Sequence, residues 1–175
     1  MTRVPARLAR PLADTMPPLT GLAAVILDRA ALGSLAPDAP DTDLTLAVAF
    51  YWALYRPEIM GPPLLFLLGL LSDALAGLPL GFTALTLLAL GLLVRGGARW
   101  LPAQPPPLIW AAFAVVAVSV ALLRWLLASL YFAWPFAPGP LLLQLGLTLL
   151  LYPPIAWLLD RLRRSAPETD HARTP

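Results

Sequence analysis

A single carboxylate, Asp73, lies within the apolar stretch FLLGLLSDALAGLPLGFTALTLL, which covers residues 66–88. An acidic side chain at the centre of a bilayer costs on the order of 2.5 to 3.5 kcal/mol on insertion scales. Such side chains usually face the interior of a helix bundle and pair with another group. Asp73 is therefore the first candidate for a functional or structural polar contact.

Small residues flank Asp73 at helical spacing. Gly69, Asp73 and Gly77 fall at i, i+4 and i+8 and share one stripe of a helix. Gly81 continues the spacing beyond the turn that contains Pro79. Small residues four positions apart let a second helix approach closely in membranes. We expect Asp73 to point into a tight helix crossing, either as a packing determinant or as a contact for a ligand, ion or partner protein.

Arg124 is the predicted ionic partner of Asp73. Counting 1.5 Å per residue from the expected helix starts places Asp73 ~16 Å and Arg124 ~24 Å into the bilayer. A flexible arginine stem and helix tilt can close the difference in depth. Asp28 and Arg29 form a competing source of partners. The remaining alternatives are that Asp73 caps backbone groups at the glycine turn or contacts a partner protein.

Other patterns that could support chemistry are missing from the sequence. There is no G-x-S-x-G, H-E-x-x-H or P-loop segment, and no histidine is placed to activate Ser72. The chain has no cysteine, and its one histidine, His171, lies in a polar tail with Glu168 and Asp170. We interpret that tail as solvated. The sequence predicts no catalytic residues, no metal site, no cofactor and no enzyme activity.

The elements that position Asp73 must be membrane helices. Of the 175 residues, 59% are hydrophobic and only 13% are charged, whereas a soluble domain has about 25% charged residues. With a net charge of +2, nucleic acid is not an expected partner. The arginines before the apolar run 19–27 resemble the start of a signal peptide, but Asp28 and Arg29 interrupt that run. A polytopic membrane protein is the better interpretation.

Proline, glycine and charged residues divide the chain into six apolar segments. These segments cover residues 17–36, 43–58, 62–77, 80–95, 107–133 and 139–160. The second, third and fourth are shorter than the ~20 residues that a full span needs, so we expect them to pack beside longer helices. The prediction is an all-α, polytopic domain of six transmembrane helices over residues 17–160, between a basic tail at 1–16 and a second tail at 161–175.

The arginines predict the orientation of these helices. If both termini are cytoplasmic, the outer side holds Asp38, Asp41 and Asp43 and, of the arginines in the tails and connections, only Arg29. The inner side then holds Arg3, Arg7, Arg10, Arg56, Arg95, Arg99, Arg161, Arg163, Arg164 and Arg173. An excess of arginine marks cytoplasmic loops. We therefore expect a multi-pass protein of the bacterial inner (cytoplasmic) membrane with both tails in the cytoplasm.

Two motifs carry a resemblance to a known family. The segment YWALYRPE at residues 51–58 precedes GLLSDALAGLPLG at residues 69–81, and the pair resembles the motifs of the rod shape-determining MreD family. The matching positions in the second span are Tyr51, Trp52, Arg56 and Pro57. The likeness extends over roughly residues 44–160 and includes the Leu-Tyr-Pro segment at Leu151–Pro153.

The resemblance implies a non-catalytic scaffold subunit of the bacterial cell-elongation complex, with a role in cell shape and lateral peptidoglycan synthesis. Its implied partners are membrane lipid, an MreC-like protein, the actin-like MreB, a RodA-like glycosyltransferase and a class B penicillin-binding protein. The family is also distantly similar to the vitamin-binding subunits of energy-coupling-factor transporters. The alternative is therefore a small-solute binding subunit, which predicts a midplane pocket drawn from Asp73, Arg124, Gln144 and a few serines and threonines.

Overall fold

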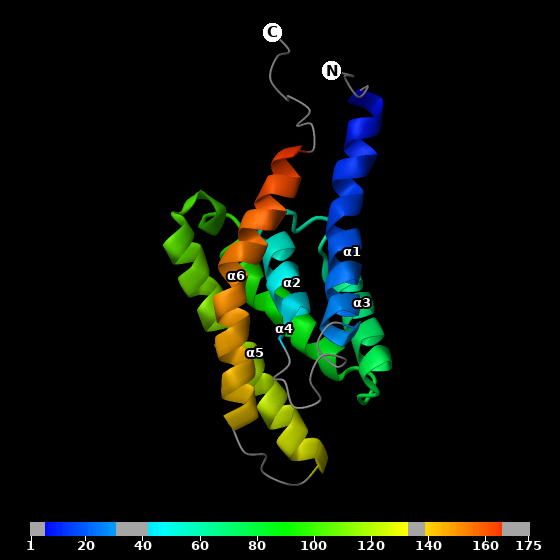
Figure 1. The fold of residues 1–175 in the computed structure, drawn as a ribbon, viewed down its shortest axis with the longest axis vertical. Helices are drawn as coiled ribbons and strands as arrows, with labels where there is room; N and C mark the ends of the chain where they lie inside the picture. Colours follow the sequence, from blue (N-terminus) through cyan, green and yellow to red (C-terminus); the bar gives the residue numbers. More distant parts are fainter. Residues whose placement is uncertain (1–5, 31–41, 133–138, 166–175) are drawn as a thin grey trace.

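The computed structural model describes residues 6–30, 42–132 and 139–165, and these residues form a helical bundle. Its elements are α1 (Ala6–Ala30), α2 (Leu44–Tyr55), α3 (Pro62–Ala76), α4 (Phe82–Arg95), the short 3-10 helix η1 (Leu101–Ala103), α5 (Pro106–Phe132) and α6 (Gly139–Ser165). Figure 1 shows that α1 begins and α6 ends at the same end of the bundle. The predicted all-α architecture of six helices is confirmed.

The helix α2 lies at the centre of the bundle (Figure 1). Every residue from Thr45 to Leu54 is buried, and α2 contacts α1, α4, α5 and α6. Its 12 residues reach only ~18 Å, which is less than the ~30 Å hydrocarbon layer of a bilayer. A helix that is apolar on all sides must be surrounded by other apolar elements. The expectation that this segment packs beside longer helices is confirmed.

The helices α3 and α4 pack against each other as a hairpin beside α1 and α2. Pro62 opens α3, at a position where its missing N–H removes no helical hydrogen bond. Each helix buries one face and leaves apolar side chains such as Leu67 and Leu85 exposed on the other. These two short helices therefore line the outside of the bundle as well as its interior.

The helices α5 and α6 are long and apolar enough, by length and composition, to cross a membrane. They hold α2 through an aromatic cluster. The rings of Phe50 and Phe113 meet edge to face with centroids 5.1 Å apart, and Phe113 stacks on Tyr152 at 4.1 Å. Offset and edge-to-face ring pairs of this kind stabilise packing beyond the burial of their area. The outer surfaces of both helices remain largely exposed.

Three helix boundaries differ from the prediction by three residues or more. The helix α2 ends at Tyr55 instead of residue 58. The helix α1 begins at Ala6 instead of residue 17, and α6 continues to Ser165 instead of ending at residue 160. The added turns are rich in alanine, leucine and arginine, which favour helix whether or not they lie in lipid. Hydropathy located the apolar part of each helix but not its ends. Arg3, residues 31–36, Asp38, Asp41, Glu168, Asp170, His171 and Arg173, and the side chains of Arg7, Arg10 and Arg29, lie outside the described residues.

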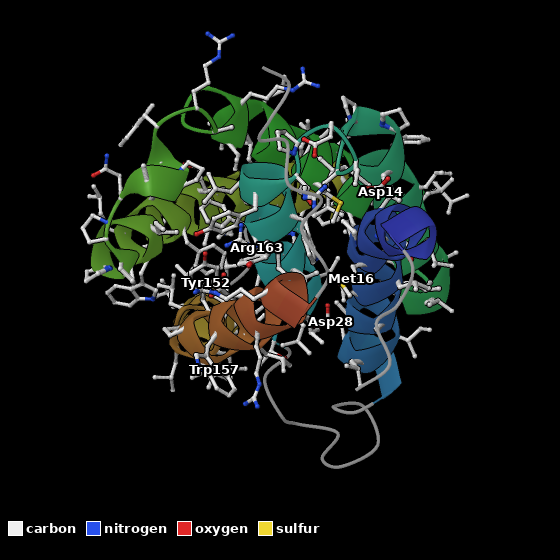
Figure 2. The ribbon with its side chains drawn as sticks, turned by 90° about the horizontal axis from the view of Figure 1, so that it is seen from above. Asp14, Met16, Asp28, Tyr152, Trp157 and Arg163 are labelled. Atoms are coloured by element: carbon white, nitrogen blue, oxygen red, sulfur yellow. The ribbon has the colours of Figure 1, made fainter. Side chains whose placement is uncertain are left out.

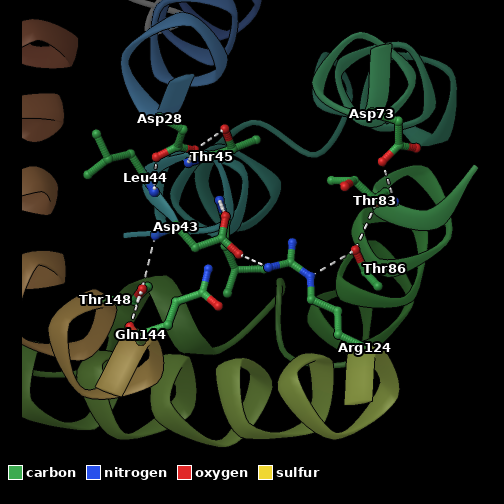
Figure 3. A network of polar contacts seen from close by, with 11 residues as sticks. Asp28, Asp43, Leu44, Thr45, Asp73, Thr83, Thr86, Arg124, Gln144 and Thr148 are labelled. Carbon is green, nitrogen blue, oxygen red and sulfur yellow. Dashed lines mark hydrogen bonds and ion pairs between the residues drawn. The ribbon is translucent and has the colours of Figure 1, made fainter. Parts of the chain in front are cut away.

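The two ends of the bundle differ in charge. We call one the arginine-rich end: α1 begins and α6 ends there, and it carries Arg56, Arg95, Arg99, Arg161, Arg163 and Arg164 together with Asp14, Glu58 and Asp160. The other, the acidic end, carries Asp28, Asp43, Asp73 and Arg124 (Figure 3).

Candidate functional site

Asp73 caps the start of α4. Its side chain is fully buried, and its two carboxylate oxygens accept hydrogen bonds from the backbone N–H groups of Gly81 (2.9 Å) and Thr83 (2.8 Å). The first N–H groups of a helix have no partner within the helix, and the helix dipole favours an anion beside them. The N-cap residue of α4 is Gly81, which has no side chain to serve as a cap. Asp73 therefore supplies from α3 the cap that the sequence of α4 lacks.

Two further buried acids cap the start of α2. Asp43 is its N-cap residue, and one carboxylate oxygen accepts from the Leu46 N–H at 3.0 Å. Asp28, at the end of α1, accepts from the N–H groups of Leu44 (2.8 Å) and Thr45 (2.9 Å). It also accepts from the Thr45 hydroxyl at 2.6 Å. The central helix thus begins against two carboxylates, which satisfy its N–H groups without water.

Arg124, on α5, connects the capped ends of α2 and α4. Its guanidinium forms an ion pair with Asp43, and its Nε donates to the Thr86 hydroxyl at 3.4 Å (Figure 3). The Thr86 hydroxyl donates in turn to the Thr83 carbonyl at 2.8 Å. The predicted ion pair between Asp73 and Arg124 is therefore wrong. Both oxygens of Asp73 already accept backbone N–H groups, and the alternative of a cap at the glycine turn is the one that forms.

The helix α6 joins the same network through Thr148. The Thr148 hydroxyl accepts from the Asp43 N–H at 3.1 Å and donates to the Gln144 carbonyl at 2.8 Å (Figure 3). Each of the six helices now contributes to the acidic end: α1 through Asp28 and α6 through Thr148, with the other four between them. The network ties together elements that are far apart in the sequence.

A polar cavity of about 170 Å³ lies within this network. It is lined by Asp28, Thr42, Asp43, Ser72, Leu78, Phe82, Thr83, Arg124 and Gln144. Of the residues named for a midplane pocket, Arg124 and Gln144 line it with one serine and two threonines, whereas Asp73 does not. Among the described residues, no three histidine or acidic side chains are placed to hold a metal ion. The acids of this site act by accepting hydrogen bonds at helix ends.

The glycine stripe has two different roles. At Gly69 an added Cβ would lie 2.3 Å from the Cα of Ala84, so α3 and α4 cross in direct backbone contact, as expected. At Gly77 the expected helix contact is wrong, because no atom lies within 4 Å of an added Cβ. Gly77 instead ends α3 with φ +64°, a left-handed conformation that costs other residues strain. Its N–H bonds to the Asp73 carbonyl, so the turn that carries Gly81 to the carboxylate begins at Gly77.

Comparison with known families identifies the chain. The model of the family described as rod shape-determining protein MreD matches residues 23–162. The chain belongs to the MreD family. It is therefore a non-catalytic, multi-pass membrane protein with a role in rod-shape determination. No curated protein and no solved structure matches it.

The residues that carry the first MreD motif have structural contacts around α2. Trp52 is buried and its indole N–H donates to the Thr20 hydroxyl of α1 at 2.7 Å. Arg56 follows the last turn of α2 and lies 3.7 Å from the Asp14 carboxylate. Pro57 follows in the turn and lines a small apolar cavity with Met60 and Leu65, among others. Tyr51 faces a second, larger cavity at the arginine-rich end.

The Leu-Tyr-Pro segment of the MreD resemblance interrupts the hydrogen bonding of α6. Pro153 lies inside the helix and has no N–H to donate to the carbonyl four residues earlier. That carbonyl belongs to Leu149, and it accepts instead from the indole N–H of Trp110 on α5 at 3.0 Å. The proline therefore creates an attachment point between the two long helices.

The roles of Asp28, Asp43, Thr83 and Thr86 were missed at the level of sequence. Asp43 directly precedes an apolar run, and that arrangement is a known helix N-cap signal. It was interpreted only as a charge on the outer side. Asp28 has no comparable sequence signal, because the N–H groups that donate to its carboxylate belong to a different helix.

Proposed function

We propose that this MreD-family protein is a scaffold subunit of the bacterial cell-elongation complex in the inner membrane. The observation that carries the proposal is the family match over residues 23–162. The buried charges support it, since Asp28, Asp73 and the Asp43–Arg124 pair all act in helix capping or in bundle stabilisation. A scaffold requires such a stable bundle with exposed surfaces for its partners.

The proposed partners are an MreC-like protein, a RodA-like glycosyltransferase, a class B penicillin-binding protein and MreB. The outer faces of α5 and α6 are the surfaces best suited to other membrane helices. Val115, Leu122, Leu126 and Leu150 are all more than half exposed there. Membrane helices associate by close packing of such surfaces in competition with lipid.

We also propose that the arginine-rich end faces the cytoplasm, because arginine is enriched in cytoplasmic loops. Reporters that are active only outside the cytoplasm should be silent when fused near residues 5 and 170. They should be active when inserted near residues 40 and 137. An active reporter at residue 5 would contradict this orientation.

Purification from native membranes tests the scaffold assignment. The tagged chain should retain MreC-like and peptidoglycan-synthesis proteins, which are identified by mass spectrometry. An Arg99→Gln variant serves as a control for the arginine-rich end, because Arg99 is exposed and outside the polar network. Recovery of transporter ATPases in place of those partners would exclude the scaffold function.

The polar cavity at the acidic end is the one observation that favours a solute-binding subunit as a second candidate. Its volume of about 170 Å³ is below the range of roughly 300 to 1,000 Å³ typical of ligand sites. Two of the charges that line it, Asp43 and Arg124, already pair with each other. A thermal-shift screen with vitamins discriminates the two functions, and a stabilising vitamin would support the second.

A further inference from the structure

A larger cavity lies at the arginine-rich end, on the opposite side of the molecule from the capping network. It has a volume of about 430 Å³, which is within the range of small-ligand sites. The ends of α2 and α6, the start of α5 and the connection that follows η1 enclose it, through Tyr51, Gln104, Ile109, Tyr152 and Arg163 among others. Figure 2 looks down on this end and shows Tyr152 and Arg163 beside α2.

Three buried polar atoms on the wall of this cavity make no hydrogen bond of good geometry, although the Tyr51 hydroxyl lies beside the Arg163 guanidinium. They are the hydroxyls of Tyr51 and Tyr152 and the Nε of Arg163. Among the described residues only one other buried side-chain atom, the Ser129 hydroxyl, shares that condition. Tyr51 and Tyr152 are 2% and 3% exposed. All three atoms carry hydrogens and can donate hydrogen bonds, so a bound group that accepts hydrogen bonds would satisfy them.

The charges around the cavity make that acceptor an anion. Among the described residues, Asp160 is the only acid that lines it, and it accepts hydrogen bonds from both Arg163 (2.8 Å) and Arg164 (2.7 Å). Two arginines therefore share one carboxylate, which leaves a net positive charge at the site. The Arg163 guanidinium is held in place over the Tyr55 ring at 4.5 Å. An oxyanion with several oxygens can accept from a guanidinium and two phenols at once.

The other walls are apolar, and the cavity opens at the surface of the bundle. Ile109, Pro153 and Ala156 lie along it, and Trp110 and Trp157 stand at its edge with 44% and 63% of their surface exposed. Tryptophan is enriched where a membrane helix meets the headgroup layer. Basic pockets between membrane helices at that depth suit anionic lipid headgroups. A free anion would use the polar atoms but leave the apolar walls uncovered.

We propose that this cavity binds the phosphate headgroup of an anionic phospholipid, with the first part of the acyl region against Ile109 and Trp110. The phosphate oxygens accept hydrogen bonds from Tyr51, Tyr152 and Arg163. This inference is independent of the proposed scaffold function, since it concerns a lipid and not a protein partner.

Thermal unfolding of the delipidated protein in a neutral detergent tests the proposal. Added phosphatidylglycerol should raise the melting temperature by several degrees, whereas phosphatidylcholine or inorganic phosphate at equal concentration should not. Native mass spectrometry of the same samples should show a bound phosphatidylglycerol. Tyr152→Phe, which removes only the unpartnered oxygen, should fold normally and bind phosphatidylglycerol about tenfold more weakly. Arg163→Gln should lose most of the binding.

The control variant is Arg99→Gln, because Arg99 is an exposed arginine at the same end that does not line the cavity. It should bind phosphatidylglycerol like the unmodified protein. Equal binding by Tyr152→Phe and the unmodified protein would overturn the proposal. Stabilisation by inorganic phosphate alone would overturn the lipid assignment in favour of a free anion. Loss of binding in all variants, Arg99→Gln included, would show only general attraction to negative charge and would also overturn it.

Discussion

The two ends of the bundle use their polar residues in opposite ways. At the acidic end, Asp28, Asp43 and Asp73 accept backbone N–H groups, and Arg124 joins the capped helices. At the arginine-rich end, the Tyr152 hydroxyl faces a cavity without a partner, and the Tyr51 hydroxyl and Arg163 Nε beside it make no hydrogen bond of good geometry. A buried polar group whose hydrogen bonds are all made stabilises the fold. A buried polar group without a hydrogen-bond partner costs stability and marks a candidate binding site. The comparison therefore supports a folding role for the acidic end and the proposed recognition role for the arginine-rich end.

Breaking the ion pair at the acidic end should have the largest effect. Arg124→Gln leaves Asp43 without its cation, and removal of one partner from a buried pair costs about 3 kcal/mol of unfolding free energy. Adding Asp43→Asn should recover much of the loss, because asparagine still caps α2. Denaturation in detergent measures both. A double variant whose loss is the sum of the two single losses would show that the pair is not coupled.

Removal of the α4 cap is expected to have the next largest effect. Asp73→Ala leaves the N–H groups of Gly81 and Thr83 without an acceptor in a buried position, at a cost of about 2 kcal/mol. The same denaturation assay measures the change. Glu58→Gln is the control, because Glu58 is a largely exposed acid whose nearest arginine contact is 3.8 Å, and it should be neutral. Unchanged stability in Asp73→Ala would contradict the capping role.

A smaller effect is expected at the turn that presents Gly81 to Asp73. Gly77→Ala forces a Cβ into the left-handed region, which costs about 1 kcal/mol. Gly146→Ala is the matched control, because Gly146 lies within α6 and nothing is within 4 Å of an added Cβ. That control should be neutral or slightly stabilising, since alanine favours helix. Equal changes in thermal stability for the two variants would contradict the claim that the left-handed conformation of Gly77 makes alanine costly there.

The smallest effect is expected at the arginine-rich end, and it sharpens the comparison most. Tyr152→Phe in delipidated protein removes a hydroxyl that has no partner, so stability should change by less than about 0.5 kcal/mol or rise slightly. Removal of the Thr45 hydroxyl by Thr45→Val at the acidic end should cost about 1 kcal/mol, because that hydroxyl donates to Asp28. A loss at Tyr152 as large as the loss at Thr45 would show that the two ends do not differ.

Much of the fold was predictable, because hydropathy and helix punctuation are local properties. Proline and glycine placed the starts of α3 and α6 and the turn between α3 and α4 close to where they lie. The pair of motifs at residues 51–58 and 69–81 led to the correct family. The close approach at Gly69 followed from small-residue spacing. Apart from the family resemblance, each of these inferences needed only neighbours within about two helical turns.

The sequence by itself determined that the helices lie in a membrane, how many helices there are, which family the chain belongs to, and that the two ends differ in charge. Only the tertiary structure decided the partner of each buried charge. Arg124 lies 81 positions from Asp43, and depth along the helix axis alone could not select Asp43 over Asp73. The acids accept hydrogen bonds from backbone N–H groups that lack a partner within their own helix, and such groups occur only in the first turn. Helix packing decides which helix start lies beside which carboxylate. That meeting is a property of the whole bundle, because each of its six helices contributes to it.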